Sequence, residues 1–282
     1  MIIFAIPLRA KETTKDWDGV LKRFNRTIKS IFNQTDPNFK CIVACNKIPS
    51  LEKEYDERLE FIELNDLAIP QTWIEMSRDK FWKLTAIAVR IREILENSSE
   101  PEKGIYVMPV DADDLFNRNI AAYCEKYTTA NGLVSRDGYV WESGKQYFRI
   151  YNKMHTYNGS CNIIKMYLDD LPTAECISDS SLCHDKETAG KLNAKFPIRF
   201  DHNTVVQKYA ENGKPFSILP FRSTIYVLGT GENISSIFHS EHCAHIAEKR
   251  RFHPVAFLRR INIFKMRYIS KAIKVEFGIE MV

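Results

Sequence analysis

Apolar and polar residues alternate along the first half of the chain in a pattern typical of strands that are followed by helices. Short apolar runs predict four strands, at residues 2–7, 41–45, 59–63 and 105–110. Apolar residues spaced three or four apart predict two helices, over 20–32 and about 79–96. Strands that alternate with helices of this length are joined by right-handed crossovers. We therefore expect an α/β fold with a mostly parallel central sheet flanked by helices.

The second half of the chain has a different pattern. Two alternating runs on either side of Ser143-Gly144 predict a hairpin over 138–151. Further strands are predicted at 161–167, 215–219 and 224–228, and a helix near 203–211. No internal repeat or low-complexity linker separates the two halves. We therefore expect one large unit with a smaller mixed second half, and no clean boundary between them.

Composition and cysteine content indicate the cellular compartment in which the protein is expected to function. The sequence contains no apolar run long enough to span a bilayer, and its apolar start lacks the basic residues of a signal peptide. Its seven cysteines form no C-x-x-C pair, which favours buried thiols in a reducing environment. We expect a cytoplasmic protein. The cluster His239-Ser-Glu-His242-Cys243-Ala-His245 offers zinc ligands, but its spacing fits no standard finger.

Charge is distributed unevenly along the chain. The net charge is +4, yet residues 249–282 alone hold nine Lys or Arg against two Glu. From Pro254 onward the apolar residues Phe257, Ile261, Phe264, Tyr268 and Ala272 recur at helical spacing, with Arg260, Arg267, Lys271 and Lys274 on a neighbouring face. The pattern predicts a basic amphipathic helix. Such a helix can lie on the anionic inner face of a membrane, or pack against the domain with its basic face in solvent.

The feature that bears chemistry is the turn Asp111-Ala112-Asp113-Asp114. It follows an apolar strand, and ligands of open α/β sheets bind at the carboxyl ends of the strands. Three carboxylates within four residues repel one another unless a cation is present, and hard oxygen ligands suit Mn²⁺ or Mg²⁺. An acidic turn that caps the next helix is the simpler alternative. The position of the turn favours a metal and nucleotide site.

The order of motifs resembles the GT-A glycosyltransferases, in particular the large inverting family of bacterial polysaccharide and lipopolysaccharide enzymes. The resembling segments, in chain order, are Ile3–Pro7, Ser30–Thr35 with Phe39–Val43, the Asp111–Asp114 turn, Phe200–His202 before a helix and Gly213, and Gly231–Ser235 with His239 beyond. The resemblance implies a nucleotide-sugar-binding half over 1–130 and an acceptor-binding and catalytic half over 131–248, followed by the basic helix of 249–282. The Q-x-x-R-W motif of processive enzymes is absent from the sequence, which favours single transfers.

The resemblance also implies roles for individual residues. Asp113 would bind Mn²⁺ or Mg²⁺ with Asp111 and His239. The donor, a UDP-sugar by preference, would contact a set from the first half: Pro7, Arg9, Asn46, Asp79, Lys80, Lys83, Asp111 and Ala112. Three positions depart from the family pattern: Cys45-Asn46-Lys47 lacks the usual acidic residue, Asp79–Lys83 replaces "A-R-N", and Asp201-His202 replaces Glu-Asp.

An inverting transfer needs a base that deprotonates the acceptor hydroxyl. Asp201 is the candidate, His202 the second, and Asp185 a reserve; Asp201 has the simpler alternative of capping the next helix. The aromatic residues Trp141, Tyr147 and Tyr151 would stack on acceptor sugars.

The sequence as a whole thus predicts a metal-dependent glycosyltransferase. It would move a sugar from a nucleoside-diphosphate sugar to a saccharide or lipid-linked saccharide in cell-surface polysaccharide synthesis, on an anionic membrane surface. A nucleotidyltransferase would be expected to show a Gly-rich loop after the first strand, which Pro7–Lys11 lacks. A nucleic-acid-binding protein that uses the basic tail has no recognisable motif to support it, so we expect no nucleic acid partner.

Overall fold

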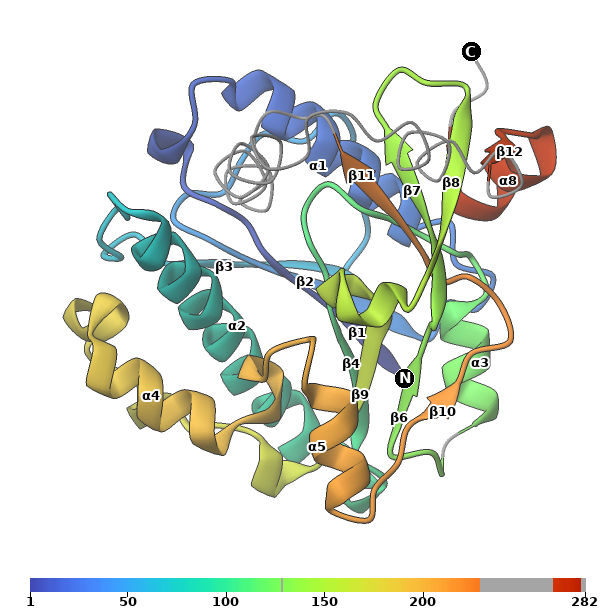
Figure 1. Ribbon diagram of the computed structural model, residues 1–282. Helices are drawn as coiled ribbons and strands as arrows, with labels where there is room; N and C mark the ends of the chain where they lie inside the picture. Colours follow the sequence, from blue (N-terminus) through green and yellow to red (C-terminus); the bar gives the residue numbers. More distant parts are fainter. Residues whose placement is uncertain (128, 229–265, 280–282) are drawn as a thin grey trace, which may run out of the picture.

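A computed structural model describes residues 1–127, 129–228 and 266–279 of the chain (Figure 1). The chain forms two sheets. The seven-stranded sheet has the order β10-β6-β9-β4-β1-β2-β3. Its strands are β1 (Ile2–Pro7), β2 (Phe39–Cys45), β3 (Leu59–Glu63), β4 (Ile105–Pro109), β6 (Gly132–Val134), β9 (Asn162–Met166) and β10 (Ser217–Ile218). β9 runs antiparallel to β4 and β6, while the other neighbouring pairs are parallel. The predicted α/β fold with a mostly parallel sheet is confirmed.

The second sheet has five strands in the order β12-β8-β7-β11-β5. They are β5 (Leu115–Phe116), β7 (Asp137–Glu142), β8 (Tyr147–Asn152), β11 (Thr224–Leu228) and β12 (Met266–Tyr268). The predicted hairpin is the antiparallel pair β7 and β8. β5 follows the Asp111–Asp114 turn directly, so the turn links the two sheets.

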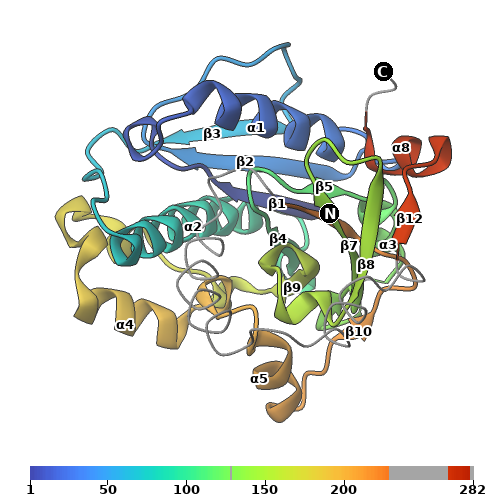
Figure 2. The same ribbon diagram turned by 45° about the horizontal axis from the view of Figure 1, so that its top comes forward.

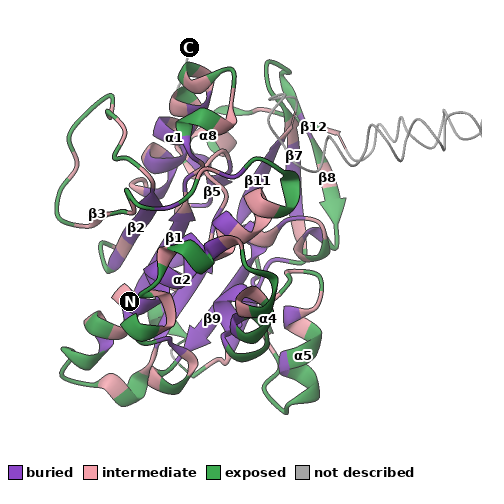
Figure 3. Ribbon diagram, turned by 90° about the vertical axis from the view of Figure 1, so that its left-hand side faces the viewer, coloured by how far each residue is buried: buried purple, intermediate pink, exposed green. Residues whose placement is uncertain are grey.

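Two long helices cover opposite faces of the large sheet, as Figure 2 shows: α1 (Trp17–Ile31) on one face and α2 (Trp73–Glu96) on the other. Shorter helices are α3 (Ile120–Lys126), α4 (Lys186–Lys195), α5 (Val205–Glu211) and α8 (Lys271–Phe277). In Figure 3 the central strands are largely buried, while α4 and α5 expose much of their surface. α2 begins earlier than the sequence predicts, because the Thr72 hydroxyl accepts a hydrogen bond from the Glu75 N–H at 3.2 Å and caps the helix.

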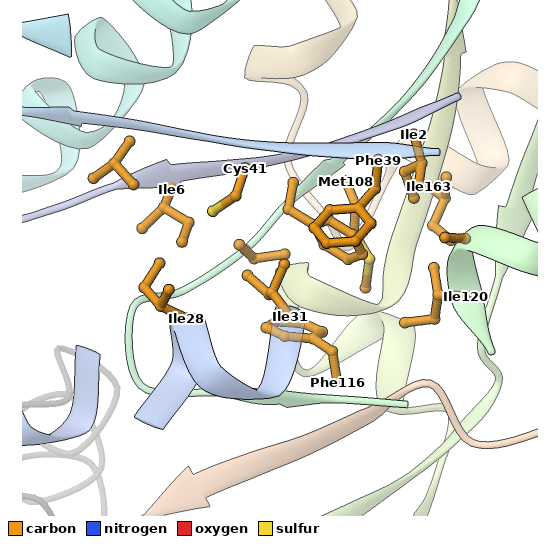
Figure 4. Packing of buried hydrophobic residues seen from close by; sticks show 14 of the residues in the cluster. Ile2, Ile6, Ile28, Ile31, Phe39, Cys41, Met108, Phe116, Ile120 and Ile163 are labelled. Carbon is orange, nitrogen blue, oxygen red and sulfur yellow. The ribbon is translucent and has the colours of Figure 1, made fainter. Parts of the chain in front are cut away.

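The apolar residues of β1 divide between two cores because side chains alternate along a strand. Ile2, Phe4 and Ile6 face α1, where they pack with Ile28 and Ile31 (Figure 4). The intervening residues of β1 face α2 and pack in a second cluster with its buried side. Each face of the sheet is therefore closed by a helix, and the carboxyl ends of β1 and β4 lie at an edge between α1 and α2.

The C-terminal segment differs from the predicted single amphipathic helix. Within the described part, Met266–Tyr268 pairs with β8 as a strand, and only Lys271–Phe277 is helical. Hydrogen bonds from Ser30 Oγ, on α1, to the Phe277 carbonyl at 2.8 Å, and from Asn33 Nδ2, just after α1, to the Val275 carbonyl at 2.9 Å hold α8 against the C-terminal end of α1. The helical spacing of Tyr268 and Ala272 therefore wrongly predicted one continuous helix. Pairing of Met266–Tyr268 with β8 gives these residues an extended backbone instead. Residues 254–265 lie outside the described residues.

We expect Phe277→Ala to lower the free energy of unfolding by about 3–5 kcal/mol, because it removes a buried aromatic ring. Phe277 is fully buried against Tyr139 and other apolar residues of the second sheet. Val275→Ala, on the exposed side of the same helix, should change stability by less than about 0.5 kcal/mol. Urea unfolding of both variants checks this expectation; equal, small effects would mean that α8 contributes little to the fold.

Candidate functional site

A pocket of about 560 Å³ lies at the carboxyl edge of the large sheet, between α1 and α2. The ends of β1 and β4, the first turns of α2 and the loop before α5 form its walls. The predicted site residues that line it are Pro7, Arg9, Asp79, Lys80, Asp111, Ala112, Asp113, Asp201 and His202. Residues from four separate segments of the chain therefore meet at this edge, which is where open α/β sheets bind their ligands.

The Asp111–Asp114 turn is held in place from both sides. The Thr27 hydroxyl, on α1, donates hydrogen bonds to the carbonyls of Ala112 (3.0 Å) and Asp114 (2.8 Å). The Asp111 N–H donates to Ser160 Oγ at 2.9 Å. The backbone of the turn is thus fixed before any ligand binds, and its side chains are presented to the pocket by rigid elements.

The carboxylates of the turn occupy different environments. Asp114 is fully buried and accepts hydrogen bonds from Asn158 Nδ2, at 2.7 Å, and from the Val227 N–H, at 3.3 Å. Burial and the neighbouring carboxylates raise its pKa well above the ordinary value. Asp114 therefore joins the turn to the second sheet, and it is absent from the pocket lining.

Asp111 and Asp113 remain as the pocket carboxylates. Asp111 forms an ion pair with Lys80, Oδ1 to Nζ, at 2.5 Å. Burial opposes ionisation of Asp111, but the Lys80 ammonium outweighs it and lowers the pKa of Asp111 below the ordinary value. Burial, together with the Asp111 charge, raises the pKa of Asp113 to about 6. Of the two pocket carboxylates, Asp113 is thus the one whose charged form a cation would stabilise more.

A divalent cation would fit this pair only together with a second source of oxygen ligands. Among the described residues, no three His, Cys, Asp or Glu side chains converge on one point. Mg²⁺ is commonly held by one or two protein carboxylates plus substrate phosphates, so a shared site is compatible with Asp111 and Asp113. The third predicted ligand, His239, lies outside the described residues.

Asp201 and His202, in the loop before α5, line the same pocket as the turn. The Asp201 carboxylate is exposed and accepts hydrogen bonds from the Asn203 N–H at 2.8 Å and from Asn203 Nδ2 at 2.9 Å. His202 Nδ1 lies 3.6 Å from Asp201 Oδ1. Burial lowers the pKa of His202, against the opposing effect of Asp201 and Asp111. Both residues therefore reach the pocket, with the Asp201 carboxylate more exposed than the His202 ring.

Three predicted residues lie away from the pocket lining. Lys83 is fully buried and pairs with Asp79 at 2.7 Å, so the structure does not support direct contact with a diphosphate. Asn46 donates to the Leu67 carbonyl at 3.2 Å, and its buried Oδ1 has no hydrogen-bond partner among the described residues. Asp185 caps α4 by accepting from the Thr188 N–H at 2.7 Å, which removes it as the reserve base.

The pocket also contains residues that the sequence did not indicate: Arg23, Trp73, Tyr157, Asn158 and Tyr226. Of the predicted acceptor aromatics, Tyr151 stacks on Tyr157 with ring centroids 4.9 Å apart, and Trp141 lies beneath the Arg26 guanidinium at 4.9 Å. Tyr147 lies on the exposed surface beside β12. Alternation along β11 could have shown that Tyr226 faces one side of the strand. It could not have shown that the pocket lies on that side.

No protein-family model and no curated protein match this sequence. Among solved structures, the chain is similar to residues 1–349 of TarS from S. aureus, with a TM-score of 0.38 and 12% sequence identity. The match covers 80% of this chain and spans 60% of the length of that one.

Proposed function

We propose that this chain is a glycosyltransferase that moves a sugar from a nucleoside-diphosphate sugar to a saccharide or lipid-linked saccharide acceptor. The observation that supports this most is the pair Asp111 and Asp113 at the carboxyl end of β4, beside Lys80 and in the same pocket as Asp201. A pocket of about 560 Å³ has room for a nucleotide-sugar. We propose a UDP-sugar as donor, an inverting and non-processive reaction, and a role in cell-surface polysaccharide synthesis.

The donor's diphosphate would lie at the turn. Asp113 and Asp111 would hold Mn²⁺ or Mg²⁺ jointly with the phosphate oxygens, and a bound metal supplies charge neutralisation for the leaving diphosphate. Lys80, kept protonated by Asp111, adds a positive charge at the same place. Asp79 pairs with Lys83 through Oδ2, while its buried Oδ1 has no hydrogen-bond partner among the described residues. Oδ1 would accept a hydrogen bond from the nucleoside.

The acceptor would enter the part of the pocket that Asp113, Asp201 and His202 line. Asp201 would accept the proton of the attacking hydroxyl, because a carboxylate that is exposed to the pocket and held by Asn203 has a free lone pair for it. His202 is the second candidate, since burial favours its neutral form, which can accept a proton. Tyr157 and Tyr226 offer aromatic faces to the acceptor's sugar rings.

A thermal-shift panel tests the donor class. UDP-, GDP- and dTDP-sugars are added to the full chain with and without Mn²⁺, because a ligand that binds only the folded state raises the melting temperature. We expect a UDP-sugar to stabilise the protein more with Mn²⁺ than without it. The proposal fails if no nucleotide-sugar shifts the melting temperature under either condition.

We also propose that the basic C-terminal segment contacts anionic membranes. No helix in the described ranges is both long enough and apolar enough to span a bilayer. Each cation near the surface adds on the order of 1 kcal/mol, so binding should weaken as salt screens it.

Vesicle sedimentation checks this expectation with the full chain. It should pellet with anionic vesicles at low salt, and less so after glutamine replaces the cations Arg260, Arg267, Lys271 and Lys274. A charge-matched control replaces exposed lysines of the body: Lys11, Lys22, Lys145 and Lys186. Equal loss of pelleting in both variants would show that overall charge, not this segment, binds the vesicles.

A further inference from the structure

Two arginines of α1 lie beside the Asp111–Asp114 turn without the partners that buried guanidinium groups require. Arg23 Nη2, and Nε and Nη2 of Arg26, are buried and have no hydrogen-bond partner among the described residues. Arg23 lines the pocket. A guanidinium group that loses water without gaining an acceptor costs stability, so these three donors favour the binding of an anionic group.

Helix geometry directs both side chains toward the turn. Arg26 and Thr27 follow Arg23 by three and four residues, so each lies beside Arg23 on the same side of α1. Thr27 donates directly to the carbonyls of Ala112 and Asp114, which places this side of α1 against the turn. The Asp113 carboxylate lies near enough to oppose the lowering of the Arg26 pKa that burial causes. Arg23 and Arg26 are therefore neighbours of the reacting centre.

Arg23 and Arg26 lie on a different helix from Lys80, the cation that we assign to the donor diphosphate. Lys80 comes from α2, which covers the opposite face of the sheet from α1 (Figure 2). Arg26 instead lies 4.9 Å above the ring of Trp141, on β7 of the second sheet. Tyr226, on the adjacent strand β11, and Tyr157 line the pocket from that same sheet's side. Arg26 thus packs against the second sheet, while Arg23 lines the pocket together with Tyr157 and Tyr226.

We propose that Arg23 and Arg26 bind an oxyanion, a phosphate or carboxylate, carried by the sugar acceptor. This deepens the proposed function and rests on it for the identity of the acceptor. Two guanidinium groups supply several N–H donors in a planar arrangement that matches the oxygens of such a group. An acceptor held by its anion on α1 and by its ring on Tyr157 and Tyr226 would have a hydroxyl between Asp113 and Asp201. The enzyme would then discriminate against neutral saccharides.

Calorimetric titration of the full chain, with UDP and Mn²⁺ at saturation, separates this site from the donor's. The probes are inorganic phosphate, and glucose 6-phosphate compared with glucose. We expect phosphate and glucose 6-phosphate to bind and glucose to bind far more weakly. Arg23→Gln and Arg26→Gln should each lower the phosphate affinity about tenfold or more, since a charged hydrogen bond is lost. Lys22→Gln, an exposed neighbour on α1, removes the same charge and should have no such effect.

Two further readouts keep the outcomes distinct. The melting temperature of Arg23→Gln should not fall, because the buried Nη2 of Arg23 has no hydrogen-bond partner in the described fold; a clear drop would assign Arg23 a structural role and overturn the proposal. Equal weakening of UDP–Mn²⁺ binding would assign the arginines to the donor and also overturn it. If the parent protein binds phosphate through Arg23 but never binds UDP, the proposed function fails and the anion site stands. UDP binding without phosphate binding would overturn the anion site and leave the proposed function standing.

Discussion

Replacing Asp113 with asparagine should lower sugar transfer by roughly 10³-fold or more while the protein stays folded. The substitution keeps the shape of the side chain but removes the charge that would hold the metal against the diphosphate. A factor of 10³ corresponds to about 4 kcal/mol, within what a bound metal contributes to a transition state. Transfer, or hydrolysis of the UDP-sugar by water, is measured at saturating Mn²⁺.

The control for Asp113→Asn is Asp169→Asn, an exposed carboxylate outside the pocket lining. It should leave the rate unchanged. The melting temperature of Asp113→Asn should not decrease, because burial and Asp111 already disfavour its ionised form. Undiminished activity of Asp113→Asn in excess EDTA would refute the metal-dependent mechanism.

Replacing Asp201 with asparagine should lower turnover by roughly 10²-fold or more, because the acceptor hydroxyl loses its base. Stability should change little. The asparagine oxygen can still accept from Asn203, and 62% of the Asp201 side chain is exposed. The affinity for the donor should be unchanged, since Asp201 acts on the acceptor. Steady-state rates with varied donor separate these two quantities.

His202 provides the comparison for the base. His202→Gln should reduce turnover less than Asp201→Asn does. If Asp201→Asn is nearly normal while His202→Gln is inactive, the base is His202. In that case turnover should rise with pH through the pKa of His202, which burial keeps below its ordinary value, because the neutral imidazole is the form that accepts a proton.

The sequence predicted the part of the fold that is set by local patterns. The apolar runs of β1, β2 and β4 and the helical spacing of α1 were recognisable because each element buries most of one face or both. α4 was missed because Leu192 is its only buried residue, which leaves too little periodicity to detect. The two-residue strand β5 was missed because its pairing with β11 depends on the fold as a whole.

The candidate site was predictable where the chemistry lies in consecutive residues. The Asp111–Asp114 turn could be recognised from its own letters and the preceding strand. Lys83 could not be separated from Lys80, because only the packing of α2 shows that Lys83 faces the interior and pairs with Asp79. Arg23 was missed for a similar reason. Nothing in the sequence of α1 indicates that Thr27 places this side of the helix against the turn.

The most direct test of the central claim is the position of a manganese ion. Crystals grown with Mn²⁺ and UDP should show an anomalous peak roughly 2.1 Å from an Asp113 carboxylate oxygen, shared with the diphosphate of UDP in the pocket between α1 and α2. Manganese and UDP bound elsewhere, or UDP bound in the pocket without any metal at Asp113, would contradict the account.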